Sequence, residues 1–285
     1  MAHTTAHWIY NLDPYAIHFP PGWPIPGIRW YGLSYLLSFA LIGFALHIYC
    51  KRGRLALNSE GLTELISALM IGVLAGGRLG YMLLYDTQRF FAQPWTFFYI
   101  TEGGMASHGG FLGVMCALLW ASKKLKTPLL PLCDAIVTVA PIGLFLGRIA
   151  NFLNDGELWG KISTVPWAII FPKSASWAGA PLEAIAPRHP SQLYEAALEG
   201  LLLGLYLQLR YWFFKPKDSG QITAEFLILY ALLRCIAEAF REPDASLILG
   251  LSRGTAYSIA LAAAGIVLFI YARRAQAASL KTHHL

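Results

Sequence analysis

Residues 129–160, LLPLCDAIVTVAPIGLFLGRIANFLNDGELWG, decide the fold of this chain. A long apolar run predicts a helix, and the polar segment 147–160 follows at its end. Arg148 and Asn151 are three residues apart and therefore share a helix face. After Phe152, the Asn-Asp-Gly sequence predicts a turn that ends the helix. A buried arginine at the end of an apolar helix is costly, so the stretch indicates either an anion-binding site or an arginine that reaches the membrane interface.

The composition of the whole chain agrees with a membrane protein. Of 285 residues, 56% are hydrophobic and only 13% are charged, and the mean hydropathy is +0.50. Soluble domains carry about 25% charged residues, so a soluble fold is excluded. The four cysteines have no CxxC or metal-ligand spacing, and we expect neither a bound metal nor a cofactor. We expect one integral-membrane domain over residues 1–285.

Seven apolar segments approach the length of about 20 residues that a membrane-spanning helix needs. They predict an all-α polytopic fold with seven transmembrane helices. The third segment is short and rich in glycine, so a re-entrant segment is an alternative for it. The segments are residues 30–49, 62–85, 108–121, 129–152, 194–214, 222–240 and 255–271.

The distribution of Lys and Arg predicts the orientation of these helices. Twelve of the 22 basic residues lie in one alternating set of short connections and at the C-terminus, whereas seven lie in the other, longer set. The first set is therefore predicted to be cytoplasmic, with the N-terminus outside and the C-terminus inside. The net charge of +6 is then a signal of topology and not of nucleic-acid binding. The first set comprises Lys51, Arg52, Arg54, Lys123, Lys124, Lys126, Arg210, Lys215, Lys217, Arg273, Arg274 and Lys281.

The longest connection, residues 154–190, is predicted to form a small head element on the outer side. It contains several proline, glycine and tryptophan residues, and the alternating pattern of residues 165–171 favours a strand. Trp159, Trp167 and Trp177 suit the headgroup region of a membrane.

Uncommon polar residues gather at the predicted outer ends of six segments, which indicates a site there. Three arginines around one cavity would suit a phosphodiester. They could equally form structural ion pairs with glutamates, for which the candidates are Glu157, Glu195, Glu238 and Glu242. His108 beside Gly109 and Gly110 could be a proton acceptor or an ordinary residue at a helix start. The candidate residues are Tyr31, Arg78, Tyr81, His108, Arg148, Asn151, His189, Glu238 and Arg241.

Several of these segments resemble the sequence blocks of the prolipoprotein diacylglyceryl transferases, a family of bacterial inner-membrane enzymes. GRIANFLNDGELWG is similar to the family signature, and further blocks follow the family's order from about residue 28 to residue 271. These blocks are RWYGLSYLLSF, GGRLGYMLLYD, GGMASHGGFLG, RHPSQLYEA and AFREPD.

The resemblance implies transfer of the diacylglyceryl group from phosphatidylglycerol to the lipobox cysteine of a preprolipoprotein. The products would be a thioether-linked lipid and glycerol 1-phosphate, and the enzyme would lie in the bacterial inner membrane with its active site toward the periplasm. The site residues that the resemblance implies are Tyr31, His108, Arg148, Asn151, Glu157, Gly160 and Arg241.

In this interpretation the arginines stabilise the charge on the leaving phosphate, and His108 is the candidate general base for the thiol. The partners would be phosphatidylglycerol, the signal peptide of a preprolipoprotein and the bilayer. An anion or lipid transporter with an outer arginine vestibule is the main alternative. An intramembrane protease is disfavoured, because the chain has neither a GxSG-like serine nor paired intramembrane aspartates.

Overall fold

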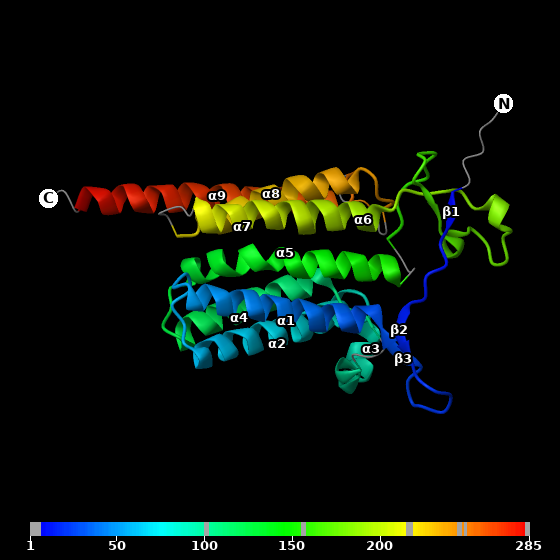
Figure 1. The fold of residues 1–285 in the computed structure, drawn as a ribbon, viewed down its shortest axis with the longest axis horizontal. Helices are drawn as coiled ribbons and strands as arrows, with labels where there is room; N and C mark the ends of the chain where they lie inside the picture. The colour runs from blue at the N-terminus through cyan, green and yellow to red at the C-terminus, as the bar shows by residue number, and fades with distance from the viewer. Residues whose placement is uncertain are drawn as a thin grey trace. The chain divides into compact units, whose positions relative to one another are not determined.

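The computed structural model describes residues 7–99, 103–154, 158–214, 219–243, 247 and 250–282, with only the backbone for residues 107 and 276–282. This part of the chain is mostly helical, as predicted (Figure 1). It divides into two compact units. Unit 1 comprises Met1–Ile42 and Val137–Leu285, and unit 2 comprises Gly43–Ile136.

A helix covers each of the seven predicted segments to within two residues of its predicted ends. Residues 191–213 form one continuous helix from α6 (Ser191–Glu195), η5 (Ala196–Leu202) and α7 (Leu203–Phe213). The others are α1 (Trp30–Lys51), α2 (Ser59–Leu84), α4 (Ser107–Lys124), α5 (Leu129–Leu153), α8 (Gln221–Glu238) and α9 (Arg253–Thr282).

Four of the described helices are long and apolar enough to cross a membrane: α1, α2, α5 and the Arg253–Ala275 part of α9. The protein is therefore a mostly helical chain with the apolar helices of a membrane protein. A membrane crossing by the other three segments remains a prediction.

In unit 2, α2 and α4 pack through a line of glycines. Gly76 and Gly80 of α2 lie directly against α4. An added Cβ on Gly76 would be 2.9 Å from Cα of Gly113, and one on Gly80 would be 2.7 Å from Cα of Gly109. Small residues at this spacing let two helix backbones touch, which is typical of helices packed in membranes. The contact fixes the start of α4, where His108 lies.

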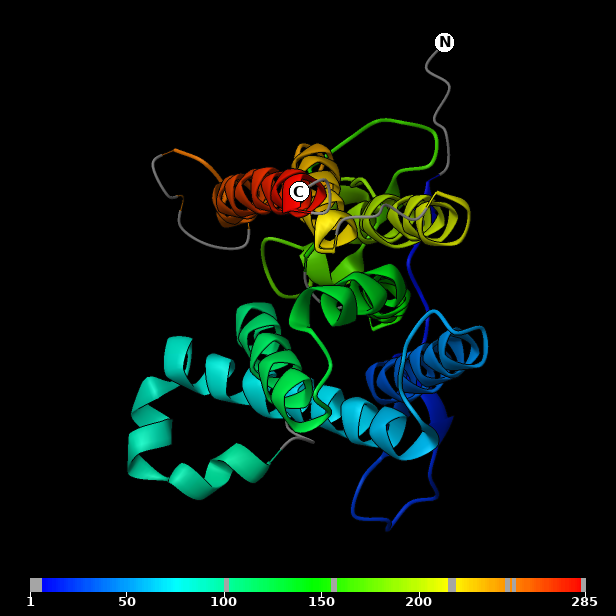
Figure 2. The same cartoon turned by 90° about the vertical axis from the view of Figure 1, so that its left-hand side faces the viewer.

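After α2, the short helices α3 (Thr87–Ala92) and η1 (Pro94–Phe98) form an arm that stands off from α2 and α4 (Figure 2). Its large side chains are exposed, with Phe91, Trp95 and Phe98 among them. Such an apolar surface is unusual in water and suits a lipid environment.

In unit 1, the continuous helix α6–η5–α7 packs against the second half of α5. An added Cβ on Gly200 would lie 2.7 Å from Cα of Phe145, and Gly204 lies beside Pro141. The Gln208 amide donates to the carbonyl of Thr138 at 2.8 Å. On the other side α8 packs along α9, where Gly265 admits the side chain of Ile228 (Figure 1).

Short strands join the N-terminal residues to the predicted head element. β1 (Trp8–Ile9) pairs in parallel with β4 (Ile169–Ile170), and β2 (Tyr15–His18) forms an antiparallel hairpin with β3 (Gly27–Arg29). β4 confirms the strand predicted within residues 165–171, whereas the N-terminal strands were not predicted. The remaining head helices are η3 (Pro172–Ser174) and η4 (Leu182–Ala184).

The core beneath the strands ties the head element to α5. Tyr10, Phe152, Ile169 and Phe171 are buried against one another. The Tyr10 hydroxyl donates to the Phe152 carbonyl at 2.7 Å, which satisfies one carbonyl at the end of α5. The core therefore fixes the end of α5, where Arg148 and Asn151 lie.

Candidate active site

Six charged side chains from three helical segments meet inside unit 1, and we call them the ionic cluster. Arg148 comes from α5, Glu195 and Glu199 from α6 and η5, and Arg234 and Glu238 from α8, while Arg241 follows α8. Three positive and three negative groups meet there, so their formal charges cancel. This balance removes most of the penalty for burying charge.

Glu195 is the centre of the ionic cluster and is only 1% exposed. Its Oε1 lies 2.7 Å from Nη1 of Arg234 and 3.0 Å from Nη1 of Arg241. Its Oε2 lies 2.9 Å from Nε of Arg148. One carboxylate thus contacts all three arginines, and ion pairs in such a poorly hydrated place are stronger than at a surface.

Glu199 and Glu238 complete the pairing. Glu199 lies 3.1 Å from Nη1 of Arg234 and 3.4 Å from Nη2 of Arg148, and Glu238 lies 2.7 Å from Nη2 of Arg234. Glu199 is carried by η5, a π-helical turn, and such turns often occur at functional sites. Gly254, at the start of α9, packs so closely on Glu238 that an added Cβ would lie 2.6 Å from its Oε2.

Arg148 is the most exposed arginine of the ionic cluster, with 18% of its side chain accessible against 10% for Arg234 and 5% for Arg241. Its Nε and Nη2 face Glu195 and Glu199, whereas Nη1 has no partner among the described residues. Asn151, one turn further along α5, is half-buried, and within the described residues its amide makes no hydrogen bond. Arg148 and Asn151 thus offer open donors on one helix face.

Arg241 is positioned by a strand-like junction between the head element and the end of α8. Gly160 forms an antiparallel bridge with Arg241, and Lys161 N donates to the Phe240 carbonyl at 2.9 Å. Gly160 also lies against His189, where an added Cβ would be 2.7 Å from the histidine Cβ. The absence of a side chain at Gly160 therefore lets the segments that carry His189 and Arg241 approach each other.

His189 is held by a chain of polar contacts. The Trp167 indole donates to the Tyr194 hydroxyl oxygen at 2.6 Å, and that hydroxyl lies 3.1 Å from His189 Nδ1. The oxygen accepts from Trp167, and its hydroxyl hydrogen can be donated to Nδ1. With the bond in that direction, the proton of a neutral imidazole is on Nε2. Burial lowers the pKa of His189 below its usual range. His189 is therefore a neutral hydrogen-bond donor in this geometry.

In unit 2, Arg78 is buried and bonds to backbone carbonyls. It donates to Thr96 at 2.7 Å, to Phe97 at 3.3 Å and to the carbonyls of Gly103 and Gly104. These bonds tie the arm to α2. Among the described residues these bonds use Nε, Nη1 and one N–H of Nη2, so the second N–H of Nη2 is left for the substrate contact predicted for Arg78.

The other predicted residues of unit 2 lie nearby. Tyr81 is one turn from Arg78, whose guanidinium carbon lies 6.0 Å from the tyrosine ring centre. Gly104 packs on this ring so closely that an added Cβ would be 2.7 Å from Tyr81 Cδ1. His108 is half-buried in the first turn of α4, next to the glycine contact with α2.

Tyr31 and Glu157 are the remaining predicted site residues. Tyr31 is the second residue of α1 in unit 1 and is exposed. Glu157 lies outside the described residues.

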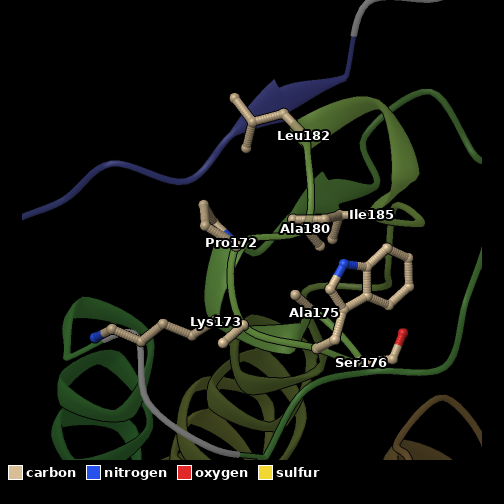
Figure 3. A pocket seen from close by; sticks show the side chains of 10 residues that line it. Pro172, Lys173, Ala175, Ser176, Ala180, Leu182 and Ile185 are labelled. Carbon is tan, nitrogen blue, oxygen red and sulfur yellow. The ribbon is translucent and has the colours of Figure 1, made fainter.

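The head element also contains a cavity of about 360 Å³ between residues 172 and 185 (Figure 3). Its lining is mostly small or apolar, with Pro172, Ala175 and Ile185 among the contributors. Lys173 extends away from the other labelled side chains in Figure 3. The cavity contains no buried charged side chain, in contrast to the ionic cluster.

A family model described as prolipoprotein diacylglyceryl transferase matches residues 16–271 of this chain. The chain belongs to this family. The family match covers both units and confirms the resemblance of the sequence blocks.

Curated members of the prolipoprotein diacylglyceryl transferase family match over most of their length. A protein of Bordetella avium (strain 197N) is 41% identical over 93% of this chain and 96% of its own length. A protein of Idiomarina loihiensis is 42% identical over 92% of this chain and 94% of its own, and one of Shewanella sp. (strain ANA-3) is 42% identical over 83% and 86%. All three are named phosphatidylglycerol–prolipoprotein diacylglyceryl transferase.

Sequence reasoning misses Glu199 altogether. It places Glu195 and Arg234 among the polar residues at the outer helix ends but does not assign them to the site. A usable signal was present, because Glu195 and Glu199 are four residues apart in an otherwise apolar segment, as are Arg234 and Glu238. Side chains at this spacing share a helix face, and charges inside an apolar helix need a partner. The partner helix of each pair could not be read from the sequence.

Proposed function

We propose that this chain transfers the diacylglyceryl group of phosphatidylglycerol to the lipobox cysteine thiol of a preprolipoprotein, the first step of lipoprotein maturation. Membership of the prolipoprotein diacylglyceryl transferase family carries this proposal, together with relatives named for the same two substrates. The open donors of Arg148 and Asn151 beside the ionic cluster supply a suitable place for a phosphodiester.

The reaction breaks one bond and forms one. The thiol sulfur attacks the diacylglycerol carbon next to the phosphate, so the C–S bond forms while the C–O bond breaks. The electron pair of the broken bond stays on the phosphate oxygen, and glycerol 1-phosphate leaves with one more negative charge than the diester had. The thiol proton passes to His108, the side chain best suited to accept it near neutral pH.

The other predicted residues support these steps. Arg148 holds the phosphate and stabilises its developing charge, and Arg241 adds a positive charge held in place by Glu195. Asn151 donates a further hydrogen bond, and Tyr31 or Glu157 assists the base. Gly160, His189 and Glu238 shape the binding region, whereas Arg78 and Tyr81 hold the arm that borders α2.

We further propose that the chain crosses the bacterial inner membrane seven times, with the N-terminus and the head element in the periplasm and the C-terminus in the cytoplasm. The excess of basic residues in one alternating set of connections supports this orientation. The donor lipid and the signal peptide would then both reach the site from within the bilayer.

The alternative of an anion or lipid transporter is less well supported. The relatives are named as transferases, and the arginines of the ionic cluster lie together at one place, where one carboxylate contacts all three. An anion pathway would instead need positive charges that remain available along a polar route.

The proposed function is tested with the purified protein in phosphatidylglycerol liposomes and a synthetic peptide with a lipobox. Transfer adds the mass of one diacylglyceryl group to the peptide and makes its cysteine unreactive toward thiol reagents. A peptide in which serine replaces the lipobox cysteine is the control. An unchanged cysteine peptide in the presence of folded protein would contradict the proposal, and a shortened peptide would indicate proteolysis.

A further inference from the structure

One buried polar atom beside the ionic cluster has no partner in the described part of the chain. Gln192 is only 1% exposed, and its side-chain carbonyl Oε1 accepts no hydrogen bond there. A buried amide oxygen without a donor is unfavourable, and most such groups in native proteins bind water or a ligand. The position of Gln192 therefore indicates a missing hydrogen-bond donor.

The helix that carries Gln192 also carries the centre of the ionic cluster. Gln192 and Glu195 are three residues apart in α6, and Glu199 follows four residues later, so all three share a helix face. Glu195 contacts both Arg148 and Arg241 through its two oxygens. Gln192 thus lies one helical turn from the carboxylate that binds the proposed phosphate-binding arginines.

The turn that begins α6 fixes Gln192 in this place. The hydroxyl of the preceding residue, Ser191, donates to the Leu158 carbonyl at 2.9 Å, and the Gln192 carbonyl accepts from Ala196 N within the helix. Leu158 is two residues from Gly160, which bridges to Arg241. The start of α6, and with it the backbone of Gln192, is therefore anchored beside the junction that positions Arg241.

We propose that Gln192 Oε1 accepts a hydrogen bond from a hydroxyl of the donor lipid's glycerol headgroup, and that this contact selects for a hydroxylated headgroup. The inference rests on the proposed function. A phosphodiester at Arg148 has its headgroup hydroxyls within a few bonds of the phosphate, and Gln192 lies one helical turn from Glu195, the partner of Arg148. A site in which a buried polar atom of the protein binds a substrate hydroxyl rejects an analogue that lacks this hydroxyl, because the protein atom is then left without a partner.

The test compares two lipids of equal charge in the transfer assay, dioleoylphosphatidylglycerol and dioleoylphosphatidylethanol. Both are singly charged phosphodiesters, but the second has no headgroup hydroxyl. We expect wild-type kcat/KM to be about 5- to 150-fold higher for phosphatidylglycerol, the range that one buried hydrogen bond provides. Gln192→Met, which keeps the side-chain length and removes the amide, should reduce this preference to within about threefold of unity.

Gln208→Leu is the matched control. Gln208 lies on the same continuous helix, but its amide already donates to the Thr138 carbonyl at 2.8 Å. Loss of this hydrogen bond is expected to lower the melting temperature of the protein and to leave the lipid preference unchanged. Gln192→Asn keeps an amide on a shorter side chain and should retain part of the preference.

Several outcomes would overturn the inference. Equal kcat/KM of the wild type for the two lipids would contradict the inference. This measurement needs no variant, so it remains decisive if Gln192→Met does not fold. If folded Gln192→Met loses kcat/KM equally for both lipids, Gln192 has a structural role. If only the KM for the peptide rises, Gln192 contacts the acceptor peptide and not the lipid. If the wild type transfers from neither lipid, the proposed function itself fails, which distinguishes that failure from a failure of the inference.

Discussion

Arg148 combines two roles within a single guanidinium group. Its Nε and Nη2 face Glu195 and Glu199, while Nη1 remains open among the described residues. The two glutamates therefore orient the guanidinium before a substrate arrives, and the open nitrogen can bind an anion without breaking these pairs. Preorganisation of this kind is effective in catalysis because little rearrangement is needed when charge develops.

We predict that Arg148→Lys is folded but severely impaired in transfer. Lysine keeps the charge, but its donors all lie on one nitrogen. It therefore cannot reproduce the planar fork, in which separate nitrogens face the glutamates and the anion. We expect a loss of about a hundredfold or more in kcat/KM, as for removal of one oriented donor to a developing charge. Arg148→Ala should be inactive. The assay is transfer to the lipobox peptide, with the melting temperature in detergent measured in parallel.

Arg210→Lys is the matched control for Arg148→Lys. Arg210 also forms a half-buried ion pair, at 2.9 Å from Glu225, but it lies outside the ionic cluster. Its substitution should leave kcat/KM nearly unchanged. Near-normal transfer by folded Arg148→Ala would remove Arg148 from the phosphate site.

We predict a different defect for His108→Gln. If His108 accepts the thiol proton, turnover should fall about a hundredfold or more while phosphatidylglycerol binding is retained. Raising the pH should partly restore the rate, because a larger fraction of the peptide is then thiolate. A parallel loss of lipid affinity would identify His108 as a headgroup ligand instead.

His189 should behave unlike a general base. Its lowered pKa and its contact with Tyr194 predict a neutral imidazole at pH 7, protonated on Nε2. Because the unfolded chain takes up this proton near pH 6.5, the stability contribution is present above that pH and is lost as the pH falls through the lower folded pKa. Nitrogen NMR of labelled histidine measures both the tautomer and the titration midpoint. A midpoint above 6.5, or a proton on Nδ1 in the wild type, would contradict this description.

At the level of elements, the packing of α2 on α4 depends on the absence of side chains. An added Cβ on Gly113 would lie 2.7 Å from the carbonyl carbon of Gly72, so the two backbones would have to separate. By contrast, an added Cβ on Gly110 would find its nearest neighbour at 3.9 Å. Two glycines three residues apart in one helix thus have opposite tolerance for a side chain.

We predict that Gly113→Ala destabilises the protein and that Gly110→Ala does not. The first forces α4 away from α2, and overpacking of this kind typically costs about 1–3 kcal/mol. The second gains helix propensity of up to about 1 kcal/mol relative to glycine. Both effects are measured as melting temperatures in detergent, taken from the loss of the monodisperse peak in size-exclusion chromatography after heating. Equal melting temperatures for the two variants would contradict the observed helix contact.

The positions of the main helices could be predicted because apolar runs and their polar boundaries are local features of the sequence. The end of α5 at Leu153, for example, lies one residue beyond the boundary predicted at Phe152. The pairing of β1 with β4 could not be predicted, because it joins residues about 160 positions apart and depends on a core around Tyr10. The π-helical turn of η5 likewise depends on packing against Phe145 and on the ion pairs of Glu199.

The candidate site was predicted more fully in its residue types than in its pairing. Arg148, Glu238 and Arg241 were identified as site residues and do meet in one cluster. The sequence also left open that the arginines neutralise glutamates, and the structure contains these ion pairs. It could not indicate that a single carboxylate, Glu195, joins the three arginines, since this depends on how three helical segments pack.

At the level of the whole molecule, the proposed orientation predicts which residues can be labelled from outside the cell. In a variant with its four cysteines replaced by serine, Ser176→Cys should react with a membrane-impermeant maleimide in cells with a permeabilised outer membrane. Arg52→Cys should react only after the inner membrane is opened. Both positions are exposed, so accessibility within the protein does not limit either reaction. The reverse labelling would invert the proposed topology.

The ionic cluster also constrains how the chain is made. In the seven-span arrangement, α5 enters the membrane with Arg148 before its partners on α6–η5–α7 have been synthesised, and that helix in turn brings two carboxylates. Neither helix is electrically neutral at this depth until the other has arrived, whereas Arg234 and Glu238 neutralise each other within α8. Biogenesis must therefore delay the release of α5 into lipid until the following hairpin can join it. A nascent chain that stops between these helices would remain at the insertion machinery as a substrate for quality control.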